Sequence, residues 1–295
     1  MSAIADTLSS RPQRIARHFV DRLFREKPLG AASGGVFLLF LFCGLFAGLL
    51  APHGMNEISP LNRLRPPSWQ FPFGTDNLGR DMLSRCLYGA QLSVIIGISG
   101  AALATAISAF IGIVSGYLGG KLDLVVQRFV DAWMSFPALI VLIVVVSVVG
   151  PGMPQIIVTL GLLLGIGGSR VIRGAVISVR EHLYVHAAQA IGASTARILW
   201  RHILPNVLPP LIVLFTTRVG TVILAESGLA FLGLGVPPPA PTWGGMLSGS
   251  GRTFMFQGPW LALAPGLCLT TVVYASNMFG DALRDLLDPR MRGSR

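Results

Sequence analysis

The chain has 295 residues, of which 52% are hydrophobic and 12% are charged, and its mean hydropathy is +0.66. These values exclude an ordinary soluble domain, in which about a quarter of the residues are charged, and indicate a protein whose solvent is the bilayer. The formal charge of +10 does not indicate nucleic-acid binding, because the basic residues lie between apolar runs. The cysteines Cys43, Cys86 and Cys268 form no CxxC pair, so we predict neither a metal site nor a disulfide framework.

The first basic stretch precedes the first apolar run. Residues 11–27 place Ile15, Phe19 and Leu23 on one helical face with arginines elsewhere, which fits a helix on the membrane surface or a solvated basic tail. Both interpretations place residues 1–30 in the cytoplasm. Residues 31–51 carry no charge and are long enough for one transmembrane helix. A cleaved signal peptide is disfavoured, because the basic region is long and no small-x-small site follows.

Five further crossings follow this first helix. Residues 52–89 are polar and rich in proline, and we expect them outside the membrane. Glycine and proline at 150–154 predict a tight turn between the third and fourth crossings, which therefore form a hairpin. Pro265 predicts a kink in the last crossing. The predicted crossings after the first lie within 86–120, 124–149, 155–172, 206–234 and 253–280.

The distribution of basic residues predicts the orientation. Of the 23 Lys and Arg residues, one lies inside the fifth crossing, five lie in segments on one side, and the remaining 17 lie on the side of the N-terminus. Cytoplasmic segments carry the excess of Lys and Arg, so both termini are predicted to be cytoplasmic. The minority group is Arg63, Arg65, Arg80, Arg85 and Arg252.

The cytoplasmic segment 173–205 is too rich in helix formers for a loose linker, although its charges predict an aqueous loop. Leu183, Ala187 and Ile191 fall at helical spacing. Gly192 predicts a sharp helix end, and Pro205 predicts the end of a second short helix. This pattern is typical of a helix presented to a partner protein.

This loop resembles that of permease subunits of bacterial ATP-binding-cassette (ABC) importers, whose pattern is E-A-A, three residues, G, nine residues, I-x-L-P. His186-Ala187-Ala188, Gly192 and Leu204-Pro205 stand at the matching spacing, while His186 replaces the glutamate and His202 the isoleucine. The resemblance implies a coupling helix that docks on an ATP-hydrolysing subunit. The residues it assigns to coupling are Glu181, Tyr184, His186, Ala187, Ala188, Gly192, Ala193, Leu204 and Pro205.

Other stretches resemble the second, or C-type, permease of the dipeptide, oligopeptide and nickel branch of this family. They are residues 71–81 (FPFGTDNLGRD), 117–123 (YLGGKLD), 231–238 (FLGLGVPP), Trp243-Gly244 and 280–290 (GDALRDLLDPR). The resemblance covers most of the chain from residue 31 onward. It implies an all-α integral membrane protein of the type I importer permease fold with six transmembrane helices, a core at 90–282 and a cytoplasmic tail at 283–295.

The same resemblance implies the partners and the location. They are a second homologous permease, two ATP-binding subunits or a homodimer of one, and an external solute-binding protein, all at the bacterial inner membrane. ATP and magnesium would bind the ATPase subunits, and this chain would bind no cofactor. Its nearest match to a P-loop, around Gly120-Lys121, lacks the first glycine and the final hydroxyl of that motif. Asp76 and Asp81 lack the spacing of a calcium loop and are expected in a structural outer loop.

Two charged residues lie inside the fifth crossing. Arg218 and Glu226 are the candidates for the translocation pathway, because charge within a membrane usually faces a bundle interior or a cavity. Eight residues of helix separate them by about 12 Å and roughly 80°, so they cannot pair directly. Glu226 fits a structural hydrogen-bond anchor equally well. Arg128 and Asp131 are expected to form an intramolecular ion pair or to be solvated at the helix end, rather than to contact the solute.

We therefore expect an ATP-driven importer permease for peptides or related solutes that works by alternating access. Nickel chelates, glutathione and opines are alternative cargoes within the branch. Two rival functions remain. An ion-gradient-driven secondary transporter would need titratable groups near the midplane, and only Arg218 and Glu226 qualify. A membrane scaffold that recruits an ATPase without transporting a solute is the other.

Overall fold

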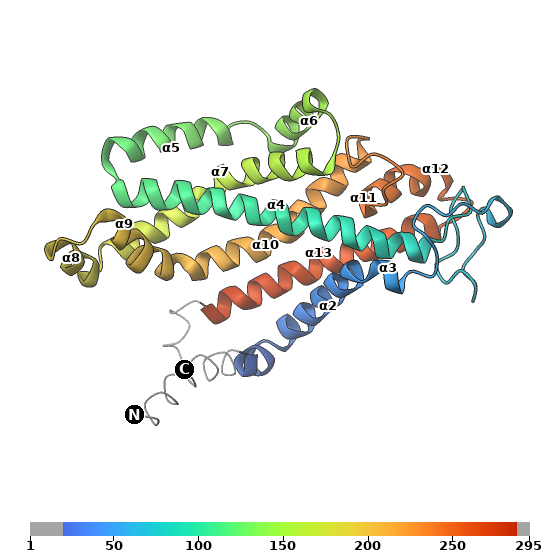
Figure 1. Cartoon of the computed structure of the whole chain (residues 1–295), viewed down its shortest axis with the longest axis horizontal. Helices are drawn as coiled ribbons and strands as arrows, with labels where there is room; N and C mark the ends of the chain where they lie inside the picture. Colours follow the sequence, from blue (N-terminus) through green and yellow to red (C-terminus); the bar gives the residue numbers. More distant parts are fainter. Residues whose placement is uncertain (1–19, 288–295) are drawn as a thin grey trace.

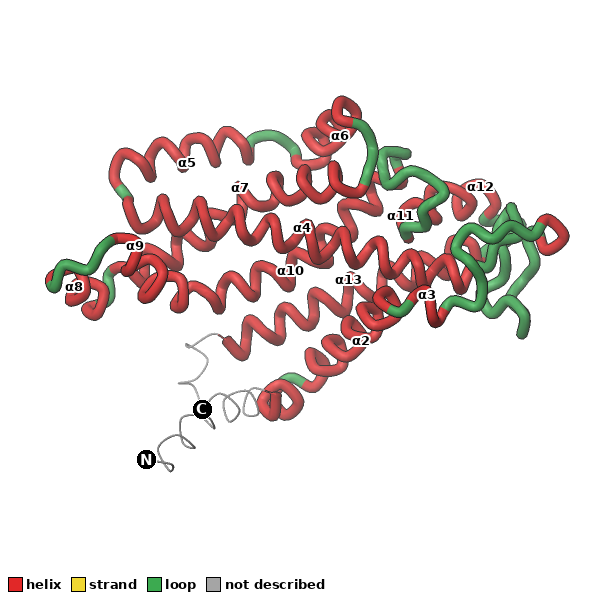
Figure 2. Tube along the Cα trace, in the orientation of Figure 1, coloured by secondary structure: helices red, strands yellow, loops and turns green. Residues whose placement is uncertain are grey.

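A computed structural model describes residues 20–287 of the chain, and these residues form a bundle of helices without a strand. Figure 2 shows the helices joined by short connections at one end and by longer loops at the other. Five helices are long and apolar enough to cross a membrane, with a sixth crossing if one bent pair is counted. The five are α2 (Pro28–Leu45), α4 (Met82–Leu118), α7 (Met153–Arg180), α10 (Leu204–Phe231) and α13 (Trp260–Leu287).

The third predicted crossing is a bent pair of helices. The helices α5 (Gly120–Met134) and α6 (Ala138–Val149) meet at 83°, and Pro137 lies at the break between them. The proline ring has no N–H for an intrahelical bond and disfavours helical geometry in the preceding residue, so a continuous helix over 124–149 does not form. The structure agrees with the predicted six crossings if this bent pair counts as one, and the turn predicted at 150–154 lies between α6 and α7.

The short elements lie at the two ends of the bundle. We name these ends after α8 and α12 (Figure 1). The α8 end carries α8 (Leu183–Ala190), α9 (Thr195–Ile198) and a π-helical turn at Leu199–Ile203. The α12 end carries α3 (Ala47–Leu50), a 3-10 turn at Pro60–Asn62, α11 (Trp243–Met246), a π-helical turn at Leu247–Gly251 and α12 (Arg252–Phe254).

Several predicted boundaries are wrong, and the errors are largest in the segment expected to be a loop. Of the predicted loop 173–205, the first eight residues continue α7 and the last eleven belong to α9, the π turn and α10. Pro205 does not end a helix. It is the second residue of α10 and follows directly after the π turn. Proline is tolerated in the first turn of an α-helix, because its missing backbone N–H is not needed for an intrahelical hydrogen bond there.

Other boundaries shift by several residues. Helix α4 begins inside the predicted outer segment 52–89, because Asp81 caps its first turn by accepting a hydrogen bond from the Ser84 N–H at 2.9 Å. Helix α13 begins only after Gly258-Pro259 and extends past residue 282 to Leu287. The predicted surface helix at 11–27 lies largely outside the described residues, and only its part from residue 20 is seen.

Small residues let the central helices approach closely. A methyl group at Gly112 of α4 would lie 2.7 Å from the Ser169 carbonyl oxygen of α7, and one at Gly165 of α7 would lie 2.7 Å from Cβ of Ile107. Glycine at such contacts is typical of membrane helices, whose association depends on close packing rather than on the hydrophobic effect. Figure 1 shows α4, α7 and α10 at the centre, α13 and α2 on one flank, and α5 and α6 on the other.

The first helix packs against the last. Ala282 of α13 lies against Gly30 of α2, and Lys27 forms an ion pair with Asp285 at 2.5 Å. The two ends of the described chain therefore lie at the same end of the bundle, the α8 end. This agrees with the predicted even number of crossings.

The loop before α4 is built around a buried carboxylate. Asp76 accepts hydrogen bonds from the N–H groups of Leu78 and Arg80 at 2.8 and 3.0 Å, and from Arg80 Nε at 2.6 Å. Its side chain is fully buried. Asp76 and Asp81 thus have structural roles, as predicted, and the described residues contain no cluster of three or more acidic, histidine or cysteine side chains that could hold a metal ion.

Candidate functional site

The α8 end presents a short helix that is anchored on one face and exposed on the other. Val185 and Ala188 of α8 are buried, at 0% and 7% exposure, in a cluster with Ile172 of α7 and Ile203 of the π turn. These two residues are three apart and share one face of the helix. The helix is therefore seated on the ends of two membrane-spanning segments.

The opposite face of this region is apolar but uncovered. Leu183 is 87% exposed, Ile191 85% and Trp200 73%. Large exposed apolar side chains of this kind are typical of a surface that binds another protein or a membrane. The helical spacing of Leu183 and Ile191 is visible in the sequence, but the sequence did not show whether this face is buried or exposed. The structure exposes it and buries the face of Val185 and Ala188 instead.

Gly192 ends α8 in the manner that its sequence position predicts. Its φ is +79°, in the left-handed region that glycine adopts without strain. The Gly192 N–H donates to the Gln189 carbonyl and the Ala193 N–H donates to the Ala188 carbonyl, both at 3.0 Å. This pair of hydrogen bonds is the Schellman motif, and it fixes the direction in which the chain leaves α8.

The remaining residues predicted for coupling divide into two groups. Ala193 and Leu204 are partly buried against the cluster below α8. The Tyr184 ring lies 6.1 Å from the His202 ring and 5.4 Å from the His182 ring, so the histidine that replaces the family's isoleucine contacts α8. Five residues are exposed at the surface, namely Glu181, Tyr184, His186, Ala187 and Pro205.

Arg218 lies at a junction of three helices inside the bundle. It is only 7% exposed; its Nη1 donates to Ser108 Oγ of α4 at 3.0 Å, and its Nη2 donates to the Leu164 carbonyl of α7 at 2.6 Å. Ser108 Oγ in turn donates to the Gly165 carbonyl at 2.6 Å. Within residues 20–287 the guanidinium has no carboxylate partner. The side chain joins α4, α7 and α10.

Glu226 lies in the same helix but does not meet Arg218. It is fully buried, its Oε2 accepts from Ser227 Oγ at 3.4 Å, and its Oε1 has no hydrogen-bond partner among the described residues. The neighbouring Ser227 backbone contacts Gly244 of α11. The predicted separation of Arg218 from Glu226 is confirmed, whereas their role in a translocation pathway stays a prediction.

Sequence reasoning missed the ion pairs that hold α5 to α7. Arg173 Nε of α7 donates to Asp123 Oδ1 of α5 at 2.6 Å, and Arg170 pairs with Asp131. Of the two alternatives for Arg128 and Asp131, the ion pair is present, at 3.7 Å. The sequence signal was available, because isolated charges at the ends of apolar runs need partners on neighbouring helices.

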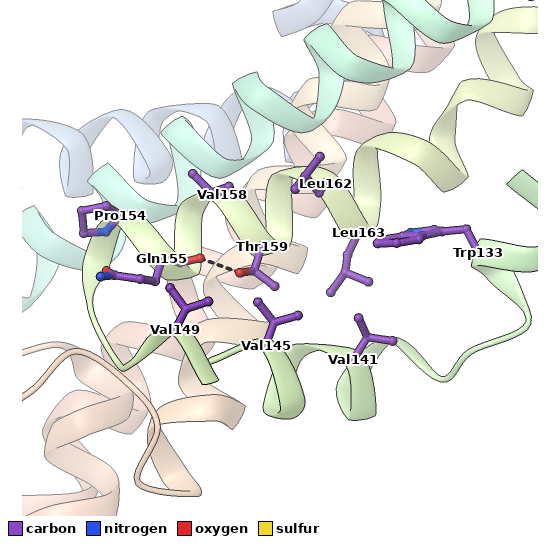
Figure 3. A pocket seen from close by; sticks show the side chains of 10 residues that line it. All are labelled: Trp133, Val141, Val145, Val149, Pro154, Gln155, Val158, Thr159, Leu162 and Leu163. Atoms are coloured by element: carbon purple, nitrogen blue, oxygen red, sulfur yellow. Dashed lines mark hydrogen bonds between the residues drawn. The ribbon is translucent and has the colours of Figure 1, made fainter. Parts of the chain in front are cut away.

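A cavity of about 340 Å³ lies where α5 and α6 diverge from α7 (Figure 3). Trp133 closes one end, and valines of α6 face Thr159 and Leu163 of α7. Thr159 Oγ1 donates to the Gln155 carbonyl of its own helix at 2.7 Å. The cavity is lined almost entirely by apolar side chains, so it offers a charged solute almost no hydrogen-bonding groups.

Two family models match the chain. The model for binding-protein-dependent transport system inner membrane components matches residues 108–293, and the model for the N-terminal transmembrane domain of oligopeptide transport permease C matches residues 20–67. Together they cover the described structure except residues 68–107. The first includes the α8 end, Arg218 and Glu226.

Curated relatives match over most of their length. A probable peptide ABC transporter permease protein of Sinorhizobium fredii is 40% identical over 293 residues, covering 99% of this chain and 100% of the relative. A dipeptide transport system permease protein of Alkalihalophilus pseudofirmus is 40% identical, covering 86% and 83%. A probable D,D-dipeptide transport system permease protein of Escherichia coli is 35% identical, covering 98% of each.

Solved structures match the fold. A chain of the inward-facing MetNI methionine ABC transporter aligns with a TM-score of 0.58 and 19% identity, covering 70% of this chain and 98% of that one. A second crystal form gives a TM-score of 0.55 with 20% identity. The bundle has the fold of an ABC transporter permease, and the family models and relatives agree with it. This chain therefore belongs to the binding-protein-dependent transport system inner membrane components, the multi-pass permease subunits of ABC transporters.

Proposed function

We propose that this permease imports di- or oligopeptides with energy from ATP hydrolysed, with magnesium, on two separate subunits. The names of the three relatives above support peptides as the cargo. The chain would pair with a second homologous permease, and an external solute-binding protein would deliver the peptide to the α12 end near residues 52–81 and 235–252. The relatives give no support to an ion-gradient mechanism.

The exposed apolar surface at the α8 end carries this proposal. Leu183, Ile191 and Trp200 project from the bundle, and in a lone chain they would lie in water. A docked ATPase subunit would cover them and remove their apolar area from water, which is worth about 25 cal/mol per Å². The α8 end would then be cytoplasmic and both termini with it, in agreement with the excess of basic residues on that side.

The anchoring of α8 supports a way to transmit motion. Val185 and Ala188 pack on residues of α7, the π turn and α10. A push on α8 from a closing ATPase dimer would therefore move the ends of two membrane-spanning helices rather than bend a loose loop. The Schellman turn at Gly192 keeps α8 at a fixed angle to α9. Alternating access would follow from this rigid connection.

The experiment compares the same substitution at the two ends of the bundle. Leu183→Asp places a charge on the proposed docking surface, and Leu61→Asp does so at the α12 end, where Leu61 is 92% exposed. Both side chains project outward, so neither change disturbs the core. Each variant is expressed with its partner subunits, purified, analysed for co-purifying ATPase by mass spectrometry, and reconstituted to measure ATP-dependent uptake of a labelled dipeptide.

We expect Leu183→Asp to lose the ATPase subunits and uptake, and Leu61→Asp to retain the ATPase subunits. The reverse result would place the ATPase at the α12 end and contradict the proposed orientation. Retention of ATPase and uptake in both variants would refute the docking surface. Uptake of nickel chelates, glutathione or an opine in place of any peptide by the wild type would refute the proposed cargo.

A further inference from the structure

Two of the three cysteines meet between α4 and α13 near the α12 end. Cys86 is 4% exposed in a buried cluster with Met82, Met246 and Leu261, and Cys268 packs against this cluster. Both side chains therefore belong to one packed region between α4 and α13. All three cysteines are free, and Cys43 belongs to a different helix, α2.

The backbone around the two thiols is held in place. Trp243 Nε1 donates to the Cys86 carbonyl at 3.1 Å, and the same fully buried indole belongs to a cluster that Cys268 contacts. Trp243 thus bridges the two cysteine positions. A disulfide needs Cα atoms about 4.4–6.8 Å apart, so two cysteines that pack into one cluster between adjacent helices are candidates for such a bond.

One of the thiols is accessible from the apolar surface of the bundle. Cys268 lines a groove of about 370 Å³ together with Pro72, Trp260, Leu263 and Leu267, of which the last two are 59% and 65% exposed. Cys268 lies eight residues into α13, about 12 Å along a helix long and apolar enough to span the membrane, and we expect the groove to open toward lipid there. A charged oxidant would be excluded there, whereas a flat apolar molecule would fit.

We propose that Cys86 and Cys268 form an oxidisable dithiol that a lipid-soluble quinone converts to a disulfide linking α4 to α13. Two S–H bonds break and one S–S bond forms. The two electrons and two protons that leave the sulfurs reduce the quinone to its hydroquinone. The product closes a long loop of chain between the two helices and restrains their separation at the α12 end. This modification requires neither the proposed cargo nor the proposed orientation.

The test uses membranes that contain the full chain, treated with tetramethyl-1,4-benzoquinone, which lacks an open ring position for thiol addition. The protein is then denatured and labelled with a maleimide that carries a large polymer, and free thiols are counted by gel shift. Wild type should change from three labelled cysteines to one. Cys43→Ser, the matched control that keeps the pair, should change from two to none.

Cys86→Ser and Cys268→Ser should each retain two labelled cysteines with or without the quinone. Mass spectrometry of the oxidised wild type should give a peptide that joins Cys86 to Cys268 and weighs about 2 Da less than the separate peptides together. A dithiol reductant should reverse both results. If either serine variant fails to fold, the wild type and Cys43→Ser still decide the outcome.

Three labelled thiols in the quinone-treated wild type would overturn the proposal, and so would a disulfide that includes Cys43. Thermal unfolding gives a second readout that is independent of transport. The oxidised Cys43→Ser protein should unfold at a temperature several degrees higher than its reduced form. If the fully cross-linked and the reduced protein unfolded at the same temperature, the claim that the disulfide restrains α4 relative to α13 would be wrong.

Discussion

Arg218 of α10 donates a hydrogen bond from its Nη1 to Ser108 Oγ of α4, across 3.0 Å in the interior of the bundle. The second guanidinium nitrogen bonds the Leu164 carbonyl of α7, so one side chain connects three membrane-spanning helices. A charge in this position is costly unless each of its N–H groups finds an acceptor. The surroundings of Arg218 supply serine and backbone oxygens as acceptors. The guanidinium has room beside α7 because the adjacent residue, Gly168, has no side chain.

Gly168 provides that room, and we predict that alanine there destabilises the protein. A methyl group at position 168 would lie 1.5 Å from Arg218 Nη2 and 2.8 Å from Ser108 Oγ, so the guanidinium must leave its acceptors. We expect a loss of about 1–3 kcal/mol, which is typical of overpacking, measured as a lower midpoint of thermal unfolding in detergent.

The control is Gly174→Ala in the same helix, where the added methyl group meets no neighbour within 4 Å in the part of the chain that the structure describes. This variant should be as stable as the wild type or slightly more so, because alanine favours helix over glycine by roughly 0.5–1 kcal/mol. Equal unfolding midpoints for the two variants would show that Arg218 relocates without cost and that the three-helix junction does not contribute to stability.

Ser108→Ala tests the hydroxyl at the same junction. The change removes the acceptor of the Arg218 hydrogen bond and the donor to the Gly165 carbonyl. A hydrogen bond to a charged group contributes about 1.5–3 kcal/mol, and we expect a loss in that range from chemical or thermal unfolding curves.

Ser115→Ala, in the same helix, is its control. Ser115 is also fully buried, but its hydroxyl has no hydrogen-bond partner within residues 20–287, so its removal should be neutral or stabilising. A larger loss for Ser115→Ala than for Ser108→Ala would contradict the assignment of the stabilising interaction to Arg218.

The sequence predicts the crossings well because hydropathy reports the one property that the bilayer demands of a membrane-spanning helix. Length and apolar character are local, and they located all six segments. The 83° bend at Pro137 was not predicted, since proline inside a membrane helix is often tolerated with a small kink. Its outcome depends on the packing of α5 and α6 against α7, which one sequence does not contain.

The candidate site shows the same division. The Gly192 turn was predictable, because a helix end with a left-handed residue selects glycine. The acceptors of Arg218 were not, since Ser108 lies 110 residues away and nothing in a serine within an apolar run distinguishes a partner from an idle hydroxyl. Charges inside a crossing predict that partners exist, but the fold decides which residues they are.

Packing of α2 against α13 depends on Gly30, and we predict that alanine at this position weakens the attachment of the first helix. Its methyl group would lie 2.2 Å from Cβ of Ala282, an atom that cannot move away without the backbone. We expect a loss of about 1–3 kcal/mol and faster proteolysis of the segment before α2. Gly35→Ala should leave both measurements unchanged, because its added methyl group meets no neighbouring atom of the described residues within 4 Å. Faster proteolysis in the control would point to helix α2 itself rather than to its contact with α13.

The loop before α4 contains two buried aspartates that should respond differently to the same isosteric change. Asp76 accepts from Arg80 Nε at 2.6 Å through Oδ2 while its Oδ1 accepts from two backbone N–H groups, so both oxygens are needed. An asparagine would turn an N–H₂ group toward the guanidinium and leave Arg80 without its counter-charge. We expect Asp76→Asn to cost about 2–3 kcal/mol in unfolding free energy and to expose residues 52–81 to protease.

Asp81→Asn is the matched control, because Asp81 uses a single oxygen. Its Oδ2 accepts from the Ser84 N–H and hydroxyl at 2.9 and 2.6 Å, whereas its Oδ1 has no partner among the residues described. Asparagine can therefore keep the accepting oxygen at the cap of α4, where it ranks with aspartate among helix-capping residues, and the loss should stay below about 1 kcal/mol. If Asp81→Asn were as destabilising as Asp76→Asn, the negative charge at both positions would matter rather than the specific hydrogen bonds. Unfolding in 50 mM and 500 mM salt separates these cases, since screening weakens a general charge effect but leaves the buried contact of Asp76 with Arg80 largely intact.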